Sequence, residues 1–219
     1  MIHVELLYTY AGYLLSGALV ALEIAAMALV IGVVGGTLLA LVQLYGNTLL
    51  RIIGHIYITI IRGTPMLVQI YALSFAVFPA LGIAMSAFWI AVLAIGLNSI
   101  AYVSQMVRAG IQAVGNGQIE AAQTLGFSPS QIIRLIILPQ AFRAIFPSLS
   151  NECVMLIKDS SLASVIGVAE LTHQGYFIMS ITFDALTVYA GVALIYLVMT
   201  SAVSLLLHFA EQRLMYVKN

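Results

Sequence analysis

Long apolar stretches alternate with short polar segments along the chain. A membrane-spanning helix needs about 20 mostly apolar residues, and five stretches approach or exceed this length. We therefore expect five transmembrane helices, at about residues 15–44, 65–80, 86–112, 139–159 and 185–210. Between the first two, apolar residues recur at helical spacing with Arg51 and Arg62 among them. This pattern predicts an amphipathic helix over residues 46–63 at the membrane interface.

The composition places the chain in a membrane. Of 219 residues, 63% are hydrophobic and only 7% are charged, whereas a soluble domain has about 25% charged residues. The net charge of zero provides no basic surface for nucleic acid. The single cysteine, Cys153, excludes an intramolecular disulfide, and the four histidines show no tight metal-ligand spacing. We expect one all-α integral membrane domain over residues 1–219, with its core at about 15–210.

The distribution of Lys and Arg predicts the orientation. Residues 1–50 and 79–86 contain neither. Seven basic residues cluster at the alternate connections and the C-terminus: Arg51, Arg62, Arg108, Arg134, Arg143, Arg213 and Lys218. Because cytoplasmic loops carry an excess of positive charge, we expect the N-terminus outside and the C-terminus in the cytoplasm. Lys158 is the exception, since it would lie toward the outer end of the fourth span.

The largest cytoplasmic connection has the pattern of two short helices joined at a glycine. Residues 118–125 favour a helix, and Gly126 is suited to its C-terminal cap. Ser128 can cap a second helix with Pro129 at its first position, and Pro139 is expected to end or kink that helix. A compact cytoplasmic projection is predicted, either a docking element or a plain connecting loop.

This connection also carries a recognisable motif. Glu120-Ala121-Ala122, followed by Gly126 and by Leu138-Pro139, resembles the EAA loop of the membrane subunits of bacterial ABC importers. Further stretches, covering about residues 12–213, resemble the polar amino acid permease branch, which serves glutamine, histidine or arginine. They are RGTPMLVQ (62–69), NSIAYVSQMVRAGIQAV (98–114), GQIEAAQTLG (117–126) and IKDSSLASVIGVAELT (157–172).

The resemblance implies a type I ABC importer transmembrane fold in the bacterial cytoplasmic (inner) membrane. The chain lacks a phosphate-binding loop, because its two lysines, Lys158 and Lys218, have no suitable upstream glycines. We therefore expect no enzyme and no cofactor in this chain. The implied partners are a cytoplasmic ABC ATPase dimer that binds ATP and Mg, a second membrane subunit, identical or related, and a periplasmic or lipid-anchored amino acid-binding protein. The EAA residues would couple the ATPase to the spans: Glu120, Ala121, Ala122, Gly126, Leu138 and Pro139.

Polar side chains inside the third span are candidates for the transport pathway. Asn98, Tyr102 and Gln105 share one helix face. Polar groups in a membrane usually face a bundle interior or a water-filled cavity, so these three either line a pathway or fasten helices. The resemblance favours the pathway. Many relatives have Glu where Gln105 stands, which predicts a neutral substrate such as glutamine.

Charged residues near the end of the fourth span suit a zwitterionic substrate. Asp159 could bind the ammonium and Lys158 the carboxylate, beside Ser160 and Ser161. Pro147 predicts that the helix from Pro139 onward departs from straightness.

The RGTPMLVQ segment supplies further pathway candidates. Thr64 is expected to cap a helix that starts at Pro65, whose free amides are suited to an anion. Arg62 and Gln69 belong to the same segment. The alternatives are capping alone for Thr64 and an interfacial anchor for Arg62.

Two other functional classes share some of these sequence features. A secondary transporter or channel would also need a polar cavity, but it would normally have internal repeats, and the halves show no convincing duplication. A membrane enzyme could use Ser160, Ser161 and His173, but the sequence has no G-x-S-x-G elbow.

Overall fold

A computed structural model describes residues 3–216, and in this range every regular element is a helix. This confirms the expected all-α class. In chain order the elements are α1 Val4–Thr9, α2 Ala11–Tyr45, α3 Thr48–Gly63, α4 Met66–Tyr71, the π-helix η1 Ala72–Val77, α5 Phe78–Ala80, α6 Ala87–Gln112, α7 Asn116–Thr124, α8 Pro129–Ile132, the π-helix η2 Ile133–Ile137, α9 Leu138–Asp159, the 3-10 helix η3 Ser160–Ile166, α10 Leu171–Thr182 and α11 Ala185–Tyr216.

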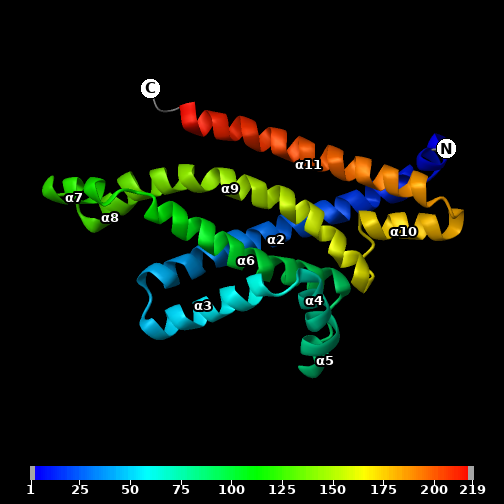
Figure 1. Cartoon of the computed structure of the whole chain (residues 1–219), viewed down its shortest axis with the longest axis horizontal. Coiled ribbons are helices and arrows are strands. Elements are labelled where there is room, and N and C mark those ends of the chain that lie inside the picture. Colours follow the sequence, from blue (N-terminus) through cyan, green and yellow to red (C-terminus); the bar gives the residue numbers. More distant parts are fainter. Residues whose placement is uncertain (1–2, 217–219) are drawn as a thin grey trace.

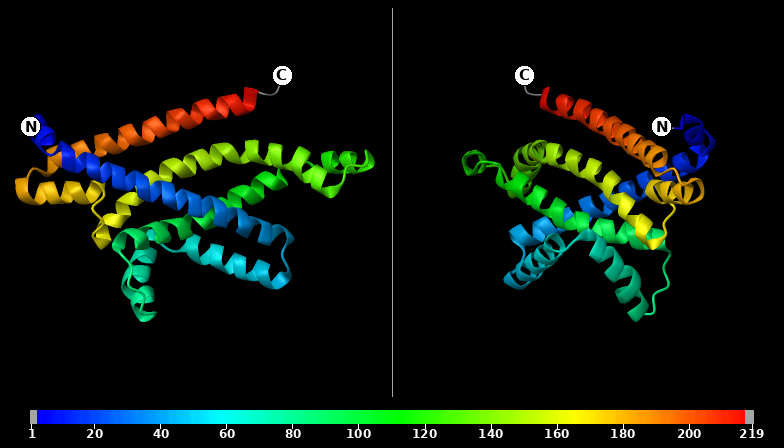
Figure 2. Two further views of the ribbon diagram at one scale, coloured as in Figure 1. Left: turned by 180° about the vertical axis from the view of Figure 1, so that it is seen from behind. Right: turned by 45° about the vertical axis from the view of Figure 1, so that its right-hand side comes forward.

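Four helices are long and apolar enough to cross a membrane: α2, α6, the run from Pro129 to Ile166 that contains α9, and α11. They coincide with four of the five predicted spans. In Figure 1 they lie along the long axis of the molecule, with the N-terminus, α10 and the start of α11 at one end. The other end holds the start of α3, α7, α8 and the end of α11, and Figure 2 shows the same arrangement from behind.

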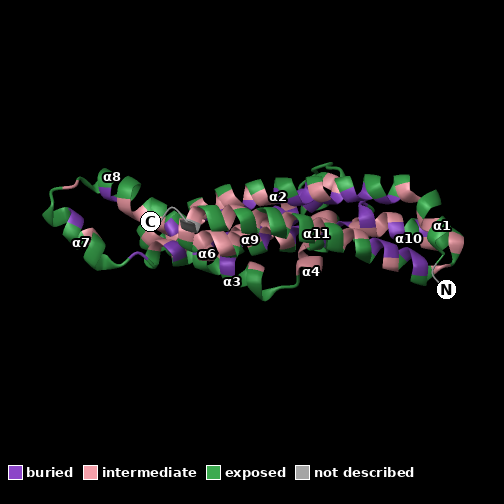
Figure 3. Ribbon diagram, turned by 90° about the horizontal axis from the view of Figure 1, so that it is seen from above, coloured by how far each residue is buried: buried purple, intermediate pink, exposed green. Residues whose placement is uncertain are grey.

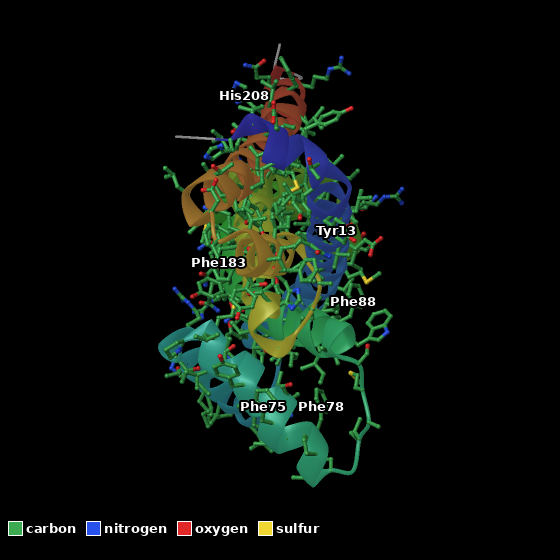
Figure 4. The ribbon with its side chains drawn as sticks, turned by 90° about the vertical axis from the view of Figure 1, so that its right-hand side faces the viewer. Tyr13, Phe75, Phe78, Phe88, Phe183 and His208 are labelled. Carbon is green, nitrogen blue, oxygen red and sulfur yellow. The ribbon has the colours of Figure 1, made fainter. Side chains whose placement is uncertain are left out.

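The fifth predicted span, residues 65–80, has a different form. It consists of α4, η1 and α5, and it qualifies as a span only together with α3, from which it is bent by 108°. The described residues therefore provide four long spans, or five if this bent pair is counted as one. The bend falls at Thr64, which is extended (φ −121°, ψ 144°) because a residue before proline avoids the helical region. Figure 4 shows Phe75 and Phe78 on the arm that results.

Small residues bring α2 against α6 in the centre of the bundle. Ala28, Gly32 and Gly36 are buried on one stripe of α2. A Cβ atom added to Gly36 would lie 2.7 Å from Cβ of Val103, so the two backbones approach closely. The main core cluster joins this contact to the end of α9 through Ile95, Leu156 and Ile157. Figure 3 shows that burial concentrates between the long helices, whereas most of α11 stays exposed.

The fourth span does not break at either proline. The π-helical turn η2 precedes Pro139, which lies at the start of α9, and α9 continues through Pro147. Pro139 was expected to end or kink this helix. The helix does not end there, but its backbone widens into a π-helical turn directly before the proline, which accommodates a residue without an N–H group. Figure 1 shows α9 as a continuous curved helix, in line with the expected departure from straightness.

Two helices were missed by the sequence pattern. α1 is too short to give a periodic signal, and α10 lies in the connection that was expected between the last two spans. α10 packs against α2 and α11 in a second core cluster with Leu14, Leu171 and Val188. This cluster closes the end of the bundle farthest from α7 and α8.

Candidate functional site

A cleft of about 500 Å³ lies between the α3–α4 bend, α6 and α9. It brings together segments that are far apart in the sequence. Its lining residues are Thr64, Pro65, Met66, Asn98, Tyr102, Met106, Ser148, Asn151, Glu152, Met155 and Asp159. Four of the predicted pathway residues, Thr64, Asn98, Tyr102 and Asp159, therefore share one cavity.

Two carboxylates from α9 face this cleft. Glu152 and Asp159 are seven residues apart, which places them on the same helix face two turns apart. Oε1 of the buried Glu152 accepts a hydrogen bond from the hydroxyl of Ser99 at 2.7 Å. Among the described residues that line the cleft, none is Lys or Arg. The arrangement therefore favours a ligand with a positively charged group.

Sequence reasoning missed Glu152. A usable signal was present, because an isolated carboxylate stands seven residues before Asp159 within an apolar helix. Its partner Ser99 directly follows Asn98 and is buried, and it was not among the residues expected to line a pathway.

The α3–α4 bend forms one wall of the cleft. Nε2 of Gln69 donates to the carbonyl oxygens of Ile61 and Thr64, at 2.8 and 3.1 Å, and its Oε1 accepts from Nδ2 of Asn98 at 3.1 Å. Gln69 thus holds the bend closed and ties it to α6. The guanidinium carbon of Arg62 lies 5.2 Å from the ring centroid of Tyr102, so a cation stands at the edge of the cleft.

Thr64 does not cap α4. Its hydroxyl donates backward to the carbonyl of Ile60 at 2.9 Å, and Pro65 occupies the N-cap position without a side-chain bond. Because Thr64 terminates α3 instead, the expected anion site at the start of α4 lacks the predicted cap.

Four other candidates do not line the cleft. Nε2 of Gln105 donates to Oε1 of Gln43 on α2, at 3.0 Å. Ser160 is buried and donates to the carbonyl of Ile157, while Ser161 donates to that of Lys158. The side chain of Lys158 is exposed. The turn of the helix at the end of α9 therefore separates Asp159 from its neighbours in the sequence.

The expected projection between α6 and α9 has the predicted local structure. α7 ends at Thr124, Gly126 follows with φ +81°, and Ser128 forms a capping box with Gln131 while Pro129 begins α8. In Figure 1 α7 and α8 extend beyond one end of the bundle.

The residues of the EAA motif differ in their exposure to the surface. Glu120 and Ala121 are exposed, whereas Ala122 is buried. Leu138 and Pro139 are exposed at the start of α9. The surface free to meet another protein therefore includes Glu120 and Ala121, but Ala122 packs inward.

Residues 32–216 match the family described as binding-protein-dependent transport system inner membrane components. The chain belongs to this family. It is the membrane permease component of an ABC importer, a class in which the ATPase is a separate subunit.

Several permeases are similar to the chain over nearly its whole length. It is 37% identical to the glutamine transport system permease protein GlnP of Escherichia coli, over 92% of each chain. It is also 37% identical to a putative GlnP of Rickettsia conorii, over 92% of this chain and 93% of that protein.

Solved structures give the same result. A crystal structure of an amino acid ABC transporter with histidines superposes with a TM-score of 0.90 at 38% identity, over 97% of this chain and 99% of that one. An inward-facing structure of the MetNI methionine ABC transporter has a TM-score of 0.73 at 20% identity and shares the fold. The expected type I importer fold is confirmed.

Proposed function

We propose that the chain carries polar amino acids across the bacterial cytoplasmic membrane and that the α4–α6–α9 cleft binds the substrate during transport. The cleft supports this proposal because α9 presents two carboxylates to it, those of Glu152 and Asp159. The substrate ammonium would bind between these carboxylates. Arg62, which stands over Tyr102 at the cleft edge, would take the substrate carboxylate.

The charge of the cleft bears on the choice of amino acid. Gln105, whose neutral side chain predicts a neutral substrate from the sequence, is bonded to Gln43 and does not line the cleft. With two carboxylates present, a cationic side chain fits the cleft as well as an amide does. Relatives are named for glutamine, and the closely similar solved transporter contains histidines. We therefore propose a polar amino acid that is neutral or cationic, and not an acidic one.

The partners follow from the proposed role. A cytoplasmic ABC ATPase dimer would bind ATP and Mg and receive α7 with its exposed Glu120 and Ala121. A second membrane subunit, identical or related, would complete the pathway, and an amino acid-binding protein would deliver the substrate. The start of α3, the segment between α8 and α9, and the end of α11 lie at the end of the bundle that carries α7 and α8, and these segments contain Arg51, Arg134 and Arg213. This supports a cytoplasmic location for that end; Lys218 lies outside the described residues.

The test is uptake by the complete complex in proteoliposomes, with glutamine, histidine, arginine and glutamate as competitors. Asp159→Asn removes the proposed ammonium partner and should abolish uptake while the complex stays assembled. Glu23→Gln is the matched control, because Glu23 is an exposed carboxylate of α2 away from the cleft. Normal uptake by the Asp159→Asn complex would refute the proposed site.

A further inference from the structure

One buried carboxylate fastens the end of the bundle that holds α10. Glu170 has no exposed surface and directly precedes α10. Its Oε1 accepts from the backbone N–H of His173 at 2.8 Å, and its Oε2 accepts from that of Thr172 at 2.9 Å. These two bonds cap the helix.

A third bond to Glu170 comes from another helix. Tyr196 of α11 donates its hydroxyl to Oε2 at 2.7 Å, and this hydroxyl also lies 3.2 Å from that of Thr172. The Tyr196 side chain packs against both core clusters, the one around Ile157 and the one around Leu171. The carboxylate therefore links α10 to α11 where the two clusters meet.

This junction adjoins the wall of the cleft. η3 begins directly after Asp159 and packs against α10 on one side and against α4 and α6 on the other. α2 closes the junction, because a Cβ atom on Gly17 would lie 2.8 Å from Cα of Leu171 and 2.9 Å from the carbonyl carbon of Glu170. Because α2 and η3 both pack against α10, we expect a displacement of α10 on α11 to reach η3.

We propose that the Glu170–Tyr196 hydrogen bond is a positioning joint that holds Asp159 in place in the cleft. Both residues act through η3, and neither lines the cleft. The inference rests on the proposed function, in which Asp159 binds the substrate ammonium. In the proposed orientation α10 lies at the outer end, so the same joint connects the surface that meets the binding protein with the substrate site.

The test compares two identical substitutions on α11. Tyr196→Phe removes the hydroxyl that reaches Glu170 but leaves the ring and both cap bonds. Tyr189→Phe is the matched control, since Tyr189 lies two turns earlier and is 39% exposed. Binding of glutamine and of arginine is measured by equilibrium dialysis on the purified complex with its ATPase and second membrane subunit, and the melting temperature is recorded on the same samples.

The joint predicts a dissociation constant about fivefold higher for Tyr196→Phe, as expected for residues coupled within one network, and no change for Tyr189→Phe. Glu170→Gln places an amide N–H group among the backbone N–H groups and the hydroxyl that donate to Glu170. It should weaken binding at least as much, and it is the test variant if the Tyr196→Phe complex does not assemble. A lower melting temperature with unchanged binding in both joint variants would show a merely structural bond and overturn the proposal. A wild-type complex that binds neither amino acid would overturn the proposed function, and the joint with it.

Discussion

The hydroxyl of Ser99 donates a hydrogen bond to Oε1 of Glu152 at 2.7 Å, and both side chains are buried. The bond joins α6 to α9, and Gly32 of α2 leaves room for the Ser99 side chain. A buried carboxylate without a partner costs free energy. This bond therefore both stabilises the bundle and fixes the direction of a group that lines the cleft.

Ser99→Ala should lower the free energy of unfolding by about 1–3 kcal/mol, because Glu152 loses its partner while it stays buried. The measurement is the melting temperature of the complex in detergent. Ser16→Ala is the control, since that exposed hydroxyl bonds only the carbonyl of Tyr13 in its own helix. Equal melting temperatures for the two variants would contradict the prediction.

Gly36→Val should destabilise the bundle by about 1–3 kcal/mol or more, because the added atoms would overlap Val103 on α6. The amount of folded protein recovered from membranes and its melting temperature both report this effect. Gly12→Val makes the same change in α2 at a position with no neighbouring atom within 4 Å. Equal recovery and stability of the two variants would argue against close α2–α6 packing.

Gly126→Val should uncouple ATP hydrolysis from uptake. The backbone there has φ +81°, where a side chain brings strain of about 1–2 kcal/mol, so the turn between α7 and α8 would change shape. The measurement is stimulation of the ATPase by the loaded binding protein in reconstituted vesicles. Gly117→Val, within α7, is the control. Full stimulation and transport in Gly126→Val would remove this turn from the coupling mechanism.

Glu152→Gln should reduce the uptake of arginine more than that of glutamine, because it removes one of two negative charges that line the cleft. Gln105→Glu should leave the ranking of substrates unchanged, since Gln105 bonds Gln43 away from the cleft. Competition uptake in proteoliposomes measures both. A shift toward cationic substrates in Gln105→Glu would instead favour the interpretation based on sequence alone.

The stability of the α10 end should depend on pH through Glu170. Burial raises the pKa of this carboxyl above its ordinary value of 4.5, in opposition to its hydrogen bonds. The folded state thus holds the proton more tightly, so the contribution is full below pH 4.5 and is lost as the pH rises through the folded pKa. Lowering the pH from about 7 to about 5 should raise the melting temperature of the wild type relative to Glu170→Gln. Parallel pH profiles for the two proteins would refute this dependence.

Local chemistry made several features predictable. The four long spans follow from hydropathy, because an apolar stretch of sufficient length has few other stable states in a membrane. The turn at Gly126 and the cap at Ser128 depend on the backbone within a few residues, and both are found as expected. The EAA motif and the flanking stretches led to the importer family for the same reason: their residues are contiguous.

The residues that line the cleft were harder to predict from the sequence. Asn98, Tyr102 and Asp159 were found by their polarity. Gln105, predicted on the same face of α6 as Asn98 and Tyr102, is bonded to α2 instead. Glu152 was missed, although it is buried and lines the cleft. Polarity shows that a side chain in a membrane needs a partner, and it does not show whether that partner is a substrate or a neighbouring helix.

The sequence by itself determined the class of protein, the long spans, the turn at Gly126 and the family, because these depend on composition, periodicity and short motifs. Only the tertiary structure decided the 108° bend at Thr64, the position of α10 and the pairing of Ser99 with Glu152. Each of these depends on contacts between residues that are distant in the chain. Such contacts are set by how helices pack together, and the pattern along a single helix does not contain that information.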